Sequence, residues 1–543
     1  MPEFVFRNVA AKGAGGVNTS MHKGTAFTQE ERASLGLEGL LPTAVETLDR
    51  QVERVLGHLG AKPNDIERFI YLQELSNSNQ TLFYATVMSD PARFVPIVYD
   101  PTIAEACLTY GHIYRRPQGM YLNRHMKGRF EEVLRNWPVK EVRFICVSSG
   151  GRILGLGDIG ANGAPIPIGK LQLYTACAGV PPEGLLPIHL DIGTTNAALR
   201  ADALYTGLRE EPPEPDAVDA IVDAFMKAAN AVFPGVCVHF EDWKGDDAIR
   251  LLERYRDRYL VYNDDIQGTA SVALAGIVTA LQIKGEALAD QRILFAGAGS
   301  AGTGIADMIV EAMRGEGLSE GEARARITLF DIGGLIEKGR KDLNASQKPF
   351  AHDWKPTEDL TDAVKQIRPT ILIGVSTVGG LFTEAVVRTM ARTCERPVIF
   401  PLSNPTEKAE CTPEQAYEWT DGKALVACGV PLPDVTLDGR TFHPGQANNF
   451  YIFPAIGLAV QATKPKRIDD AMFIEAARAT ADQVSQADRD KGMLFPRQNN
   501  ILETERTTAT RVAESIFERG LATVKRPTDI RAFIESLSYT PGY

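Results

Sequence analysis

The sequence predicts an α/β fold in which a Rossmann-type, doubly wound parallel sheet is joined to a helical N-terminal region and a second α/β region. From residue 292 on, apolar strand-like runs alternate regularly with helical segments, as expected for parallel strands joined by crossover helices. Before about residue 130 the apolar residues recur at helical spacing, and a second set of strand-like runs begins near residue 141. The runs are VRFICVSS and LLPIHLDIG in the first region and RILFAGAG, ITLFD, TILIGVST, PVIFPLSN and ALVACG in the second.

The chain has 543 residues, which is too long for one compact core. We predict an N-terminal substrate- and metal-binding domain over 1–264, helical up to about 130, and a dinucleotide-binding domain over 265–448. Residues 449–543 return to a helical pattern and are expected to pack back on the N-terminal part. Residues up to about 21 show little periodicity and are expected to be an arm, after which Thr28 is placed to cap a helix.

Composition excludes several classes of protein. A net charge of -11 repels polyanions, so no nucleic acid partner is expected. The N-terminus has no apolar signal-peptide core, and the longest apolar stretch, 270–283, is too short to span a bilayer, so we expect a cytoplasmic protein without a membrane partner. The cysteines show no CxxC spacing and are expected to be reduced core residues: Cys107, Cys146, Cys177, Cys237, Cys394, Cys411 and Cys428.

A glycine-rich turn in RILFAGAGSAGTGIADM predicts a dinucleotide site. Gly297, Gly299 and Gly302 fit GxGxxG directly after a strand and directly before a helix, and Ser300 and Ala301 lie inside the turn. Glycine permits a tight turn and close approach of the backbone to a pyrophosphate, whose charge then meets free N–H groups at the helix N-terminus. The alternative is a plain turn, which the strand–turn–helix context disfavours.

Asp331 ends the next strand, ITLFD, where a carboxyl group can accept hydrogen bonds from the adenosine ribose. An inserted helix, LSEGEARAR, accounts for its unusual distance from the glycines. An acid here repels a 2′-phosphate, and residues 332–334 supply no adjacent cation, so we expect NAD rather than NADP. Lys338, Arg340 and Lys348 further along keep NADP open.

Two acidic pairs each follow an apolar strand-like run: Glu241 and Asp242 in VCVHFEDW, and Asp264 and Asp265 in LVYNDDIQGTA. Strand ends are where the sites of α/β proteins collect. Carboxylates gathered together need a cation, and hard oxygen ligands without clustered Cys or His suit Mg²⁺ or Mn²⁺ rather than zinc. Either pair alone would more simply be a pair of solvated acids.

Lys170 lies in a Gly- and Pro-constrained stretch, GAPIPIGKLQLYTA, just ahead of an apolar helix. If it is partly desolvated or held near a cation, its pKa falls and it becomes a base for a hydroxyl proton near neutral pH. Arg152 could bind a substrate carboxylate with its guanidinium fork. Without this context, either residue would more often be a surface cation.

Together these residues resemble the malic enzyme family, from about residue 23 to the C-terminus. The motifs that carry the resemblance are TLFY, VYDPT, RILGLGD, PIGKLQLYTA, FEDW, NDDIQGTA, GAGSAG, LSNPT and GQANN. The resemblance implies a homodimer or homotetramer that oxidises L-malate with NAD(P) and a divalent metal and releases pyruvate and CO₂. It implies metal ligands Glu241, Asp242 and Asp265, an acid–base pair Tyr99 and Lys170 assisted by Asp264, and substrate contacts Arg152, Asn404 and Asn449, the last two also near the nicotinamide.

The sequence departs from the usual pattern of the family at Asp100 in VYDPT and at SSGG, residues 148–151. The YDP form also resembles malolactic enzymes, which keep NAD bound and release lactate, so this relative is the principal alternative. An alternative of another class is a non-catalytic dinucleotide-binding regulator. The joint presence of Tyr99, Lys170 and all four acidic residues argues against it.

Overall fold

The computed structural model describes residues 22–153 and 155–543, so the predicted N-terminal arm lies outside the described residues. The chain forms two compact units. Met1–Lys244 and Glu535–Tyr543 make up the first, and Gly245–Ile534 make up the second. The sequence-based division instead placed a boundary at 264 and 265 and treated 449–543 as a separate segment.

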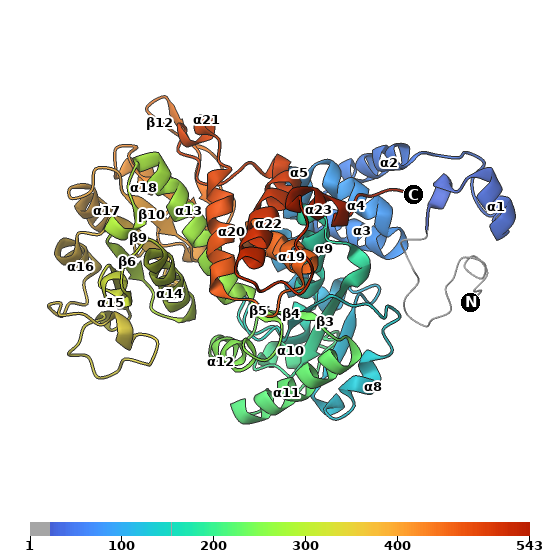
Figure 1. The fold of residues 1–543 in the computed structure, drawn as a ribbon, viewed down its shortest axis with the longest axis horizontal. Coiled ribbons are helices and arrows are strands. Elements are labelled where there is room, and N and C mark those ends of the chain that lie inside the picture. The colour runs from blue at the N-terminus through green and yellow to red at the C-terminus, as the bar shows by residue number, and fades with distance from the viewer. Residues whose placement is uncertain (1–21, 154) are drawn as a thin grey trace. The chain divides into compact units, whose positions relative to one another are not determined.

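The first unit begins with helices, as the sequence predicts (Figure 1). Thr28 caps α1 in a reciprocal capping box: its hydroxyl accepts from the Glu31 N–H, and the Glu31 carboxyl accepts from the Thr28 N–H. The helices are α1 (Gln29–Leu35), α2 (Leu48–Gly60), α3 (Asp65–Ser78), α4 (Gln80–Ser89), α5 (Pro91–Val98), α6 (Thr102–Leu108) and α7 (Tyr110–Ile113).

The sheet of the first unit is parallel, so the carboxyl ends of its strands lie at the same edge. The strands β1 (Met120–Asn123), β3 (Leu185–Asp191), β2 (Phe144–Ser148) and β4 (Cys237–Glu241) run parallel in this order. Helix α9 (Pro165–Ala178) contacts β2 and β3 and is buried along its whole length, which explains why its sequence is apolar on every side. Helix α11 (Pro215–Val232) packs on α8 (Phe130–Leu134).

The C-terminal tail belongs to the first unit. The Tyr539 N–H donates to the Gly179 carbonyl over 2.6 Å, and the Tyr543 hydroxyl donates to Gln51 Oε1 over 2.7 Å while accepting from Asn79 Nδ2 over 2.7 Å. Residues 535–543 therefore pack on α2, the start of α4 and the end of α9.

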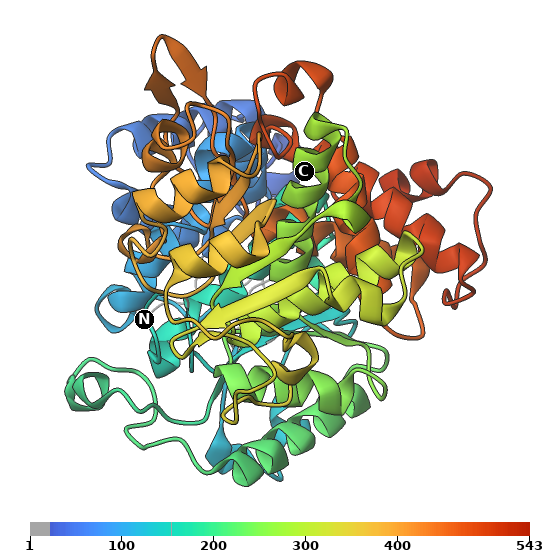
Figure 2. The same ribbon diagram turned by 90° about the vertical axis from the view of Figure 1, so that its left-hand side faces the viewer.

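The sheet of the second unit has the order β14-β11-β10-β9-β6-β7-β8. All neighbours are parallel except β7 and β8, which confirms the predicted doubly wound sheet. Its strands, coloured from green to orange, are visible in Figure 2. They are β6 (Ile293–Ala296), β7 (Ile327–Asp331), β8 (Gly334–Leu335), β9 (Ile371–Gly374), β10 (Val398–Pro401), β11 (Leu425–Cys428) and β14 (Gly445–Gln446).

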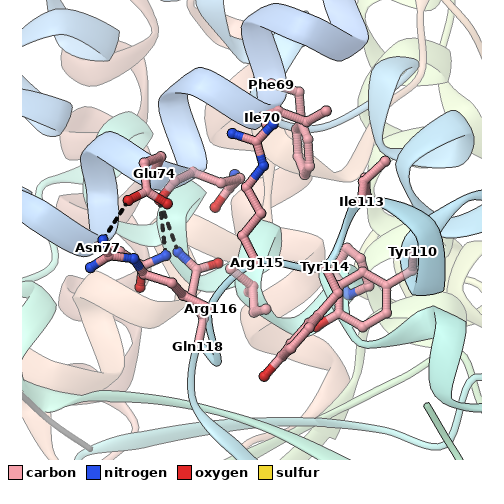
Figure 3. Close-up of a pocket in the computed structure, with 13 residues that line it drawn as sticks. Phe69, Ile70, Glu74, Asn77, Tyr110, Ile113, Tyr114, Arg115, Arg116 and Gln118 are labelled. Atoms are coloured by element: carbon pink, nitrogen blue, oxygen red, sulfur yellow. Dashed lines mark hydrogen bonds and ion pairs between the residues drawn. The ribbon is translucent and has the colours of Figure 1, made fainter. Parts of the chain in front are cut away.

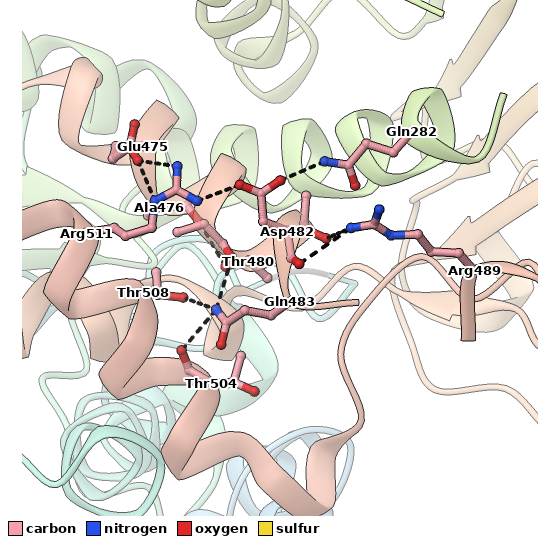
Figure 4. Close-up of polar contacts among 12 residues, drawn as sticks. Gln282, Glu475, Ala476, Thr480, Asp482, Gln483, Arg489, Thr504, Thr508 and Arg511 are labelled. Atoms are coloured by element: carbon pink, nitrogen blue, oxygen red, sulfur yellow. Dashed lines mark hydrogen bonds and ion pairs between the residues drawn. The ribbon is translucent and has the colours of Figure 1, made fainter. Parts of the chain in front are cut away.

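C-terminal helices pack on the long apolar helix of this unit. Helix α13 (Thr269–Lys284) contacts α20 (Asp470–Asp482), which contacts α22 (Ile501–Glu518). Figure 4 shows polar contacts at their edges: Arg511 pairs with Glu475 and Asp482, and Asp482 accepts from Gln282 of α13. This packing groups most of the C-terminal segment with the second unit.

One helical stretch, Asp264–Lys284, is long and apolar enough to cross a membrane by length and composition, but 72% of its apolar window is buried inside the protein. A core helix passes the same test. All seven cysteines are free and buried, as predicted. Burial raises the pKa of the Cys107 and Cys237 thiols, which keeps them protonated and unreactive.

Candidate active site

Lys170 is the central buried cation of the first unit. It lies on α9 with only 2% of its surface exposed, and its Nζ is 3.0 Å from Oε1 of Glu241 at the end of β4. The same Nζ is 5.4 Å from the ring centroid of Tyr99, which is 8% exposed and directly follows α5. The structure therefore brings together three predicted residues: a buried amine, a buried phenol and a buried carboxyl group.

Gly169 explains how the phenol reaches the amine. A Cβ at residue 169 would lie 2.9 Å from Cδ2 of Tyr99 and 3.0 Å from Cδ1 of Ile103, closer than real Cβ atoms approach their neighbours. Only glycine lets the Tyr99 ring pack against the helix backbone beside Lys170. The sequence shows only that glycine and proline constrain this stretch, and it does not reveal that Gly169 packs against Tyr99.

The end of β4 holds the second predicted ligand, Asp242, in an unusual conformation. Asp242 is 4% exposed and has φ of 53°, in the left-handed region that non-glycine residues rarely occupy. The next residue, Trp243, is 2% exposed and donates from Nε1 to the Val147 carbonyl over 3.1 Å, which anchors this turn to β2. Arg152 is exposed, and its N–H donates to the Asp242 carbonyl over 3.4 Å.

In the second unit, two predicted site residues, Asp264 and Asn449, contact each other. Asp264 is completely buried and, with the half-buried Asp265, lies in the single π-helical turn η7 (Asp264–Gly268), an element often found at functional sites. Asn449 Nδ2 donates to Asp264 Oδ2 over 2.9 Å, to its carbonyl over 3.1 Å and to Thr269 Oγ1 over 3.1 Å. A Cβ at Gly268 would lie 1.8 Å from Asp264 Oδ1, so this position requires glycine.

The predicted site residues thus fall into two sets. Tyr99, Lys170, Glu241 and Asp242 lie in the first unit, while Asp264, Asp265 and Asn449 lie in the second. The predicted assistance of Lys170 by Asp264, and the three-carboxylate metal site, draw on both sets and stay predictions. Each set alone presents buried carboxyl oxygens, the donor atoms that suit Mg²⁺ or Mn²⁺.

The glycine turn has the geometry that a dinucleotide needs. Gly297 follows β6 with φ of 116°, and a Cβ there would lie 2.4 Å from the Val375 carbonyl oxygen. Gly299 has open space around it, and a Cβ at Gly302 would lie 2.2 Å from the Gly297 carbonyl oxygen. Gly297 therefore permits the turn, Gly299 leaves room for a ligand, and Gly302 permits close packing of α14 (Ser300–Gly315). The predicted turn residues Ser300 and Ala301 are the first two residues of this helix.

The sheet order also marks this turn as a binding site. Strand β6 lies between β7 and β9, so the chain leaves β6 and β9 toward different sides, at the point where doubly wound sheets bind ligands. The turns after these two strands meet at Gly297 and Val375.

Residues 332–334 supply no cation to Asp331, but Arg340, one of the three cations that kept NADP open, contacts it directly. Arg340 donates from Nη1 to Asp331 Oδ1 over 2.7 Å and from Nη2 to Oδ2 over 3.2 Å. Hydrogen bonds to Asp342 and then to Asp331 raise the pKa of Arg340. Gln347 joins the cluster, donating to the Ala298 carbonyl over 3.1 Å and to Asp331 over 3.4 Å. The strand β8 runs antiparallel to β7, and this reversal brings residue 340 back to residue 331.

Asn404, the other predicted amide, lies in the loop after β10, which also contacts a carboxyl group that the sequence analysis missed. Glu410 is completely buried and accepts from Ser376 N and Oγ over 2.9 and 2.7 Å and from Ser403 Oγ over 2.5 Å. It thereby joins the loop after β9 to the loop that carries Asn404. A Cβ at Gly429 would lie 2.4 Å from Asn404 Oδ1, so a glycine also holds this amide's place.

A pocket in the first unit is lined by other residues than Tyr99, Lys170, Glu241 and Asp242 (Figure 3). Its lining comes from α3, α7, the segment 114–118 and two residues of α9, Pro165 and Ile168, and Arg116 pairs with Glu74 at its edge. Ile168 and Lys170 are two residues apart on α9, so their side chains leave the helix about 200° apart. The pocket is therefore on the opposite face of α9 from Lys170.

Comparison with known proteins identifies the family of the chain. The family description "Malic enzyme, N-terminal domain" matches residues 76–256, and "Malic enzyme, NAD binding domain" matches residues 266–517. The NADP-dependent malic enzyme of Mus musculus is 45% identical over 526 residues, covering 96% of this chain and 92% of the relative. The mitochondrial NADP-dependent malic enzyme of Homo sapiens is 43% identical, covering 97% of this chain and 88% of the relative.

Solved structures share the fold. The malic enzyme of Entamoeba histolytica has a TM-score of 0.58 at 22% identity, covering 93% of this chain and 91% of its own. The malic enzyme of Pyrococcus horikoshii has a TM-score of 0.55 at 23% identity, covering 82% of this chain and 88% of its own. Motifs, fold and relatives agree, and the chain belongs to the malic enzyme family.

Proposed function

We propose that this malic enzyme oxidises L-malate to pyruvate and CO₂ with NADP as the hydride acceptor and Mg²⁺ or Mn²⁺ as the metal. The observation that carries the proposal is the buried group of Lys170, Tyr99 and Glu241. Lys170 Nζ lies 3.0 Å from the Glu241 carboxyl and 5.4 Å from the Tyr99 ring. A base and an acid held side by side suit a reaction that removes one proton and adds another.

In the proposed mechanism, Lys170 accepts the proton of the C2 hydroxyl group as malate is oxidised to oxaloacetate. The Glu241 carboxyl lies 3.0 Å from Nζ and stabilises the ammonium group that forms when Lys170 takes up this proton. The C3–C4 bond then breaks, CO₂ leaves, and the electron pair forms the enolate of pyruvate. The Tyr99 hydroxyl donates its proton to C3 of this enolate, giving pyruvate. Arg152, Asn404 and Asn449 bind and orient the carboxylates.

The metal and the dinucleotide have candidate positions on this chain. Glu241, Asp242 and Asp265 would hold the metal, and their carboxyl oxygens suit a hard divalent ion. The turn at Gly297, with the N-terminus of α14, would hold the pyrophosphate. A dinucleotide held there would supply the hydride acceptor, and a metal held by these carboxyl groups would supply positive charge to stabilise an oxygen anion.

The preference for NADP replaces the NAD preference that the sequence favoured. That preference rested on the acid at Asp331 and on the lack of a cation at residues 332–334, whereas Arg340 neutralises Asp331 with two hydrogen bonds. A guanidinium at this place is what accommodates a 2′-phosphate. The curated relatives from Mus musculus and Homo sapiens are both named NADP-dependent, which supports the same assignment.

Arg340→Ala tests the cofactor assignment. We expect the KM for NADP to rise about 10- to 100-fold, because a charge-assisted hydrogen bond to phosphate is lost and Asp331 is left to repel it. The KM for NAD should change little. Lys338→Ala is the matched control, since Lys338 is a neighbouring cation that pairs with Asp353. Equal losses with NADP and NAD would contradict a 2′-phosphate contact.

Gly169→Ala tests the packing of Tyr99 against α9. The new methyl group would lie 2.9 Å from the Tyr99 ring, so the phenol must shift. We expect kcat to fall about 10- to 100-fold, since small misplacements of reacting groups are costly. The KM for NADP should stay unchanged, because the glycine turn lies in the other unit. Gly235→Ala is a weaker control because residue 235 has a φ of 78°, whereas Gly57→Ala, in open space on α2, should be neutral.

The proposed function is tested by initial rates of cofactor reduction, followed by absorbance. Purified enzyme is mixed with L-malate, Mn²⁺ and either NADP or NAD, and then with a chelator in place of the metal. We expect reduction that needs malate and metal and is faster with NADP. Reduction that persists fully after chelation would contradict the metal assignment, and faster reduction with NAD would contradict the cofactor assignment. A homodimer or homotetramer and a cytoplasmic location also remain proposals.

A further inference from the structure

Helix α9 and strand β4 make a second side-chain contact beside the contact of Lys170 with Glu241. His239 and Glu241 are two residues apart on β4 and therefore face the same side of the sheet. Lys170 and Tyr174 are four residues apart on α9 and share one face of the helix. Tyr174 contacts His239, and Lys170 contacts Glu241. Two side chains of the helix therefore contact two side chains of the strand.

Both ring nitrogens of His239 take part. Nδ1 is 3.0 Å from the Tyr174 hydroxyl, and Nε2 is 2.8 Å from Glu241 Oε2. His239 and Tyr174 are completely buried. A lone pair on Nε2 facing the carboxyl oxygen would be repulsive, so we assign the proton to Nε2, which donates to Glu241. Nδ1 then accepts the Tyr174 proton.

The two oxygens of Glu241 are thereby held from two directions. Oε1 meets Lys170 Nζ at 3.0 Å, and Oε2 accepts from His239 at 2.8 Å. A glutamate has several rotatable bonds, and ordering it on binding costs side-chain entropy. Hydrogen bonds that order the carboxyl group beforehand remove part of this cost. Partners of this kind behind a ligating carboxylate contribute to metal affinity.

We propose that His239, held in one tautomer by Tyr174, is a positioning residue that orients the Glu241 carboxyl group for the divalent cation. The inference rests on the proposed function, which makes Glu241 a metal ligand. It adds two residues, His239 and Tyr174, to which neither the sequence analysis nor the proposed mechanism assigns a role.

The test measures Mn²⁺ binding directly, without turnover, from the decrease of the free Mn²⁺ electron paramagnetic resonance signal. Removing both ring hydrogen bonds in His239→Leu should weaken Mn²⁺ binding about 10- to 100-fold. Tyr174→Phe removes only the hydrogen bond that fixes the tautomer of His239, so it should weaken Mn²⁺ binding less. His239→Gln keeps an amide donor toward Glu241 and should restore most of the affinity. Thermal unfolding of each metal-free variant shows whether it is folded.

His189→Leu is a matched control. His189 is a buried histidine on the neighbouring strand β3, and neither of its ring nitrogens has a hydrogen-bond partner within the described part of the chain. Its Mn²⁺ affinity should equal that of the unchanged enzyme. If folded His239→Leu and Tyr174→Phe both bind Mn²⁺ normally, or if His189→Leu weakens binding as much as His239→Leu, the positioning role is overturned. Absence of Mn²⁺ binding in the unchanged enzyme would instead overturn the metal assignment itself.

Discussion

Lys170→Ala should lower kcat for malate oxidation about 10²- to 10⁴-fold, the range expected when a general base is lost. Lys170 is 2% exposed, so bulk water has little access to replace it. Initial rates of NADP reduction measure the loss. A small primary amine such as methylamine, added to the variant, should restore part of the rate because it can occupy the space left by the side chain.

The control is Lys284→Ala. Lys284 is also well covered, with 4% of its side chain exposed and an ion pair to Glu286, but it lies at the end of α13 and outside the site. This variant should keep its kcat within a few-fold. A fully active Lys170→Ala enzyme would contradict the assignment of the base, and a loss that no amine relieves in a folded protein would weaken it in favour of a structural role.

Tyr99→Phe should also lower the rate of pyruvate formation about 10²- to 10⁴-fold, since it removes the proton donor for C3. A partial reaction should distinguish this variant from Lys170→Ala. Reduction of oxaloacetate to malate by NADPH does not need protonation at C3, so the variant should keep most of this partial reaction. Absorbance of NADPH follows that reaction, and the change in absorbance of enolpyruvate follows protonation at C3.

Tyr110→Phe is the matched control for Tyr99→Phe. Tyr110 is a buried tyrosine of the same unit whose hydroxyl bonds to the Tyr121 hydroxyl over 2.8 Å. Losing this hydroxyl should not change either partial reaction. Equal damage to oxaloacetate reduction and to enolpyruvate protonation in Tyr99→Phe would show that the phenol is not specific to the second proton transfer.

Features encoded by local spacing were predictable from the sequence. The glycines of the dinucleotide turn each have a steric reason within a few residues or across one neighbouring strand, and the rhythm of strands and helices predicts the doubly wound sheet. The Thr28 cap and the buried helix α13 are local in the same sense. Periodicity and turn chemistry act over short distances, so one sequence displays them.

Features that depend on distant contacts were not predictable in this way. Arg340 meets Asp331 because β8 reverses the chain, and the residues directly after Asp331 do not reveal this pairing. Glu410 accepts from Ser376, 34 residues earlier, and His239 meets Tyr174, 65 residues earlier. No spacing rule links such residues, although a buried glutamate or histidine becomes noticeable once burial is known.

The packing partner of the C-terminal segment also could not be predicted from its sequence. Its helical character was evident, but helicity does not identify the packing partner. Contacts of α20 with α13 assign most of the segment to the dinucleotide-binding unit, while Tyr539 and Tyr543 return to the first unit.

The central claim is that this chain converts L-malate to pyruvate with net reduction of NADP. Its most direct test is a carbon-13 NMR analysis of uniformly labelled L-malate after turnover with Mn²⁺ and NADP, with reduced cofactor measured in the same tube. We expect labelled pyruvate and CO₂, with pyruvate and NADPH formed in equal amounts. Labelled lactate without net NADPH, or unchanged malate in the presence of bound dinucleotide, would contradict it.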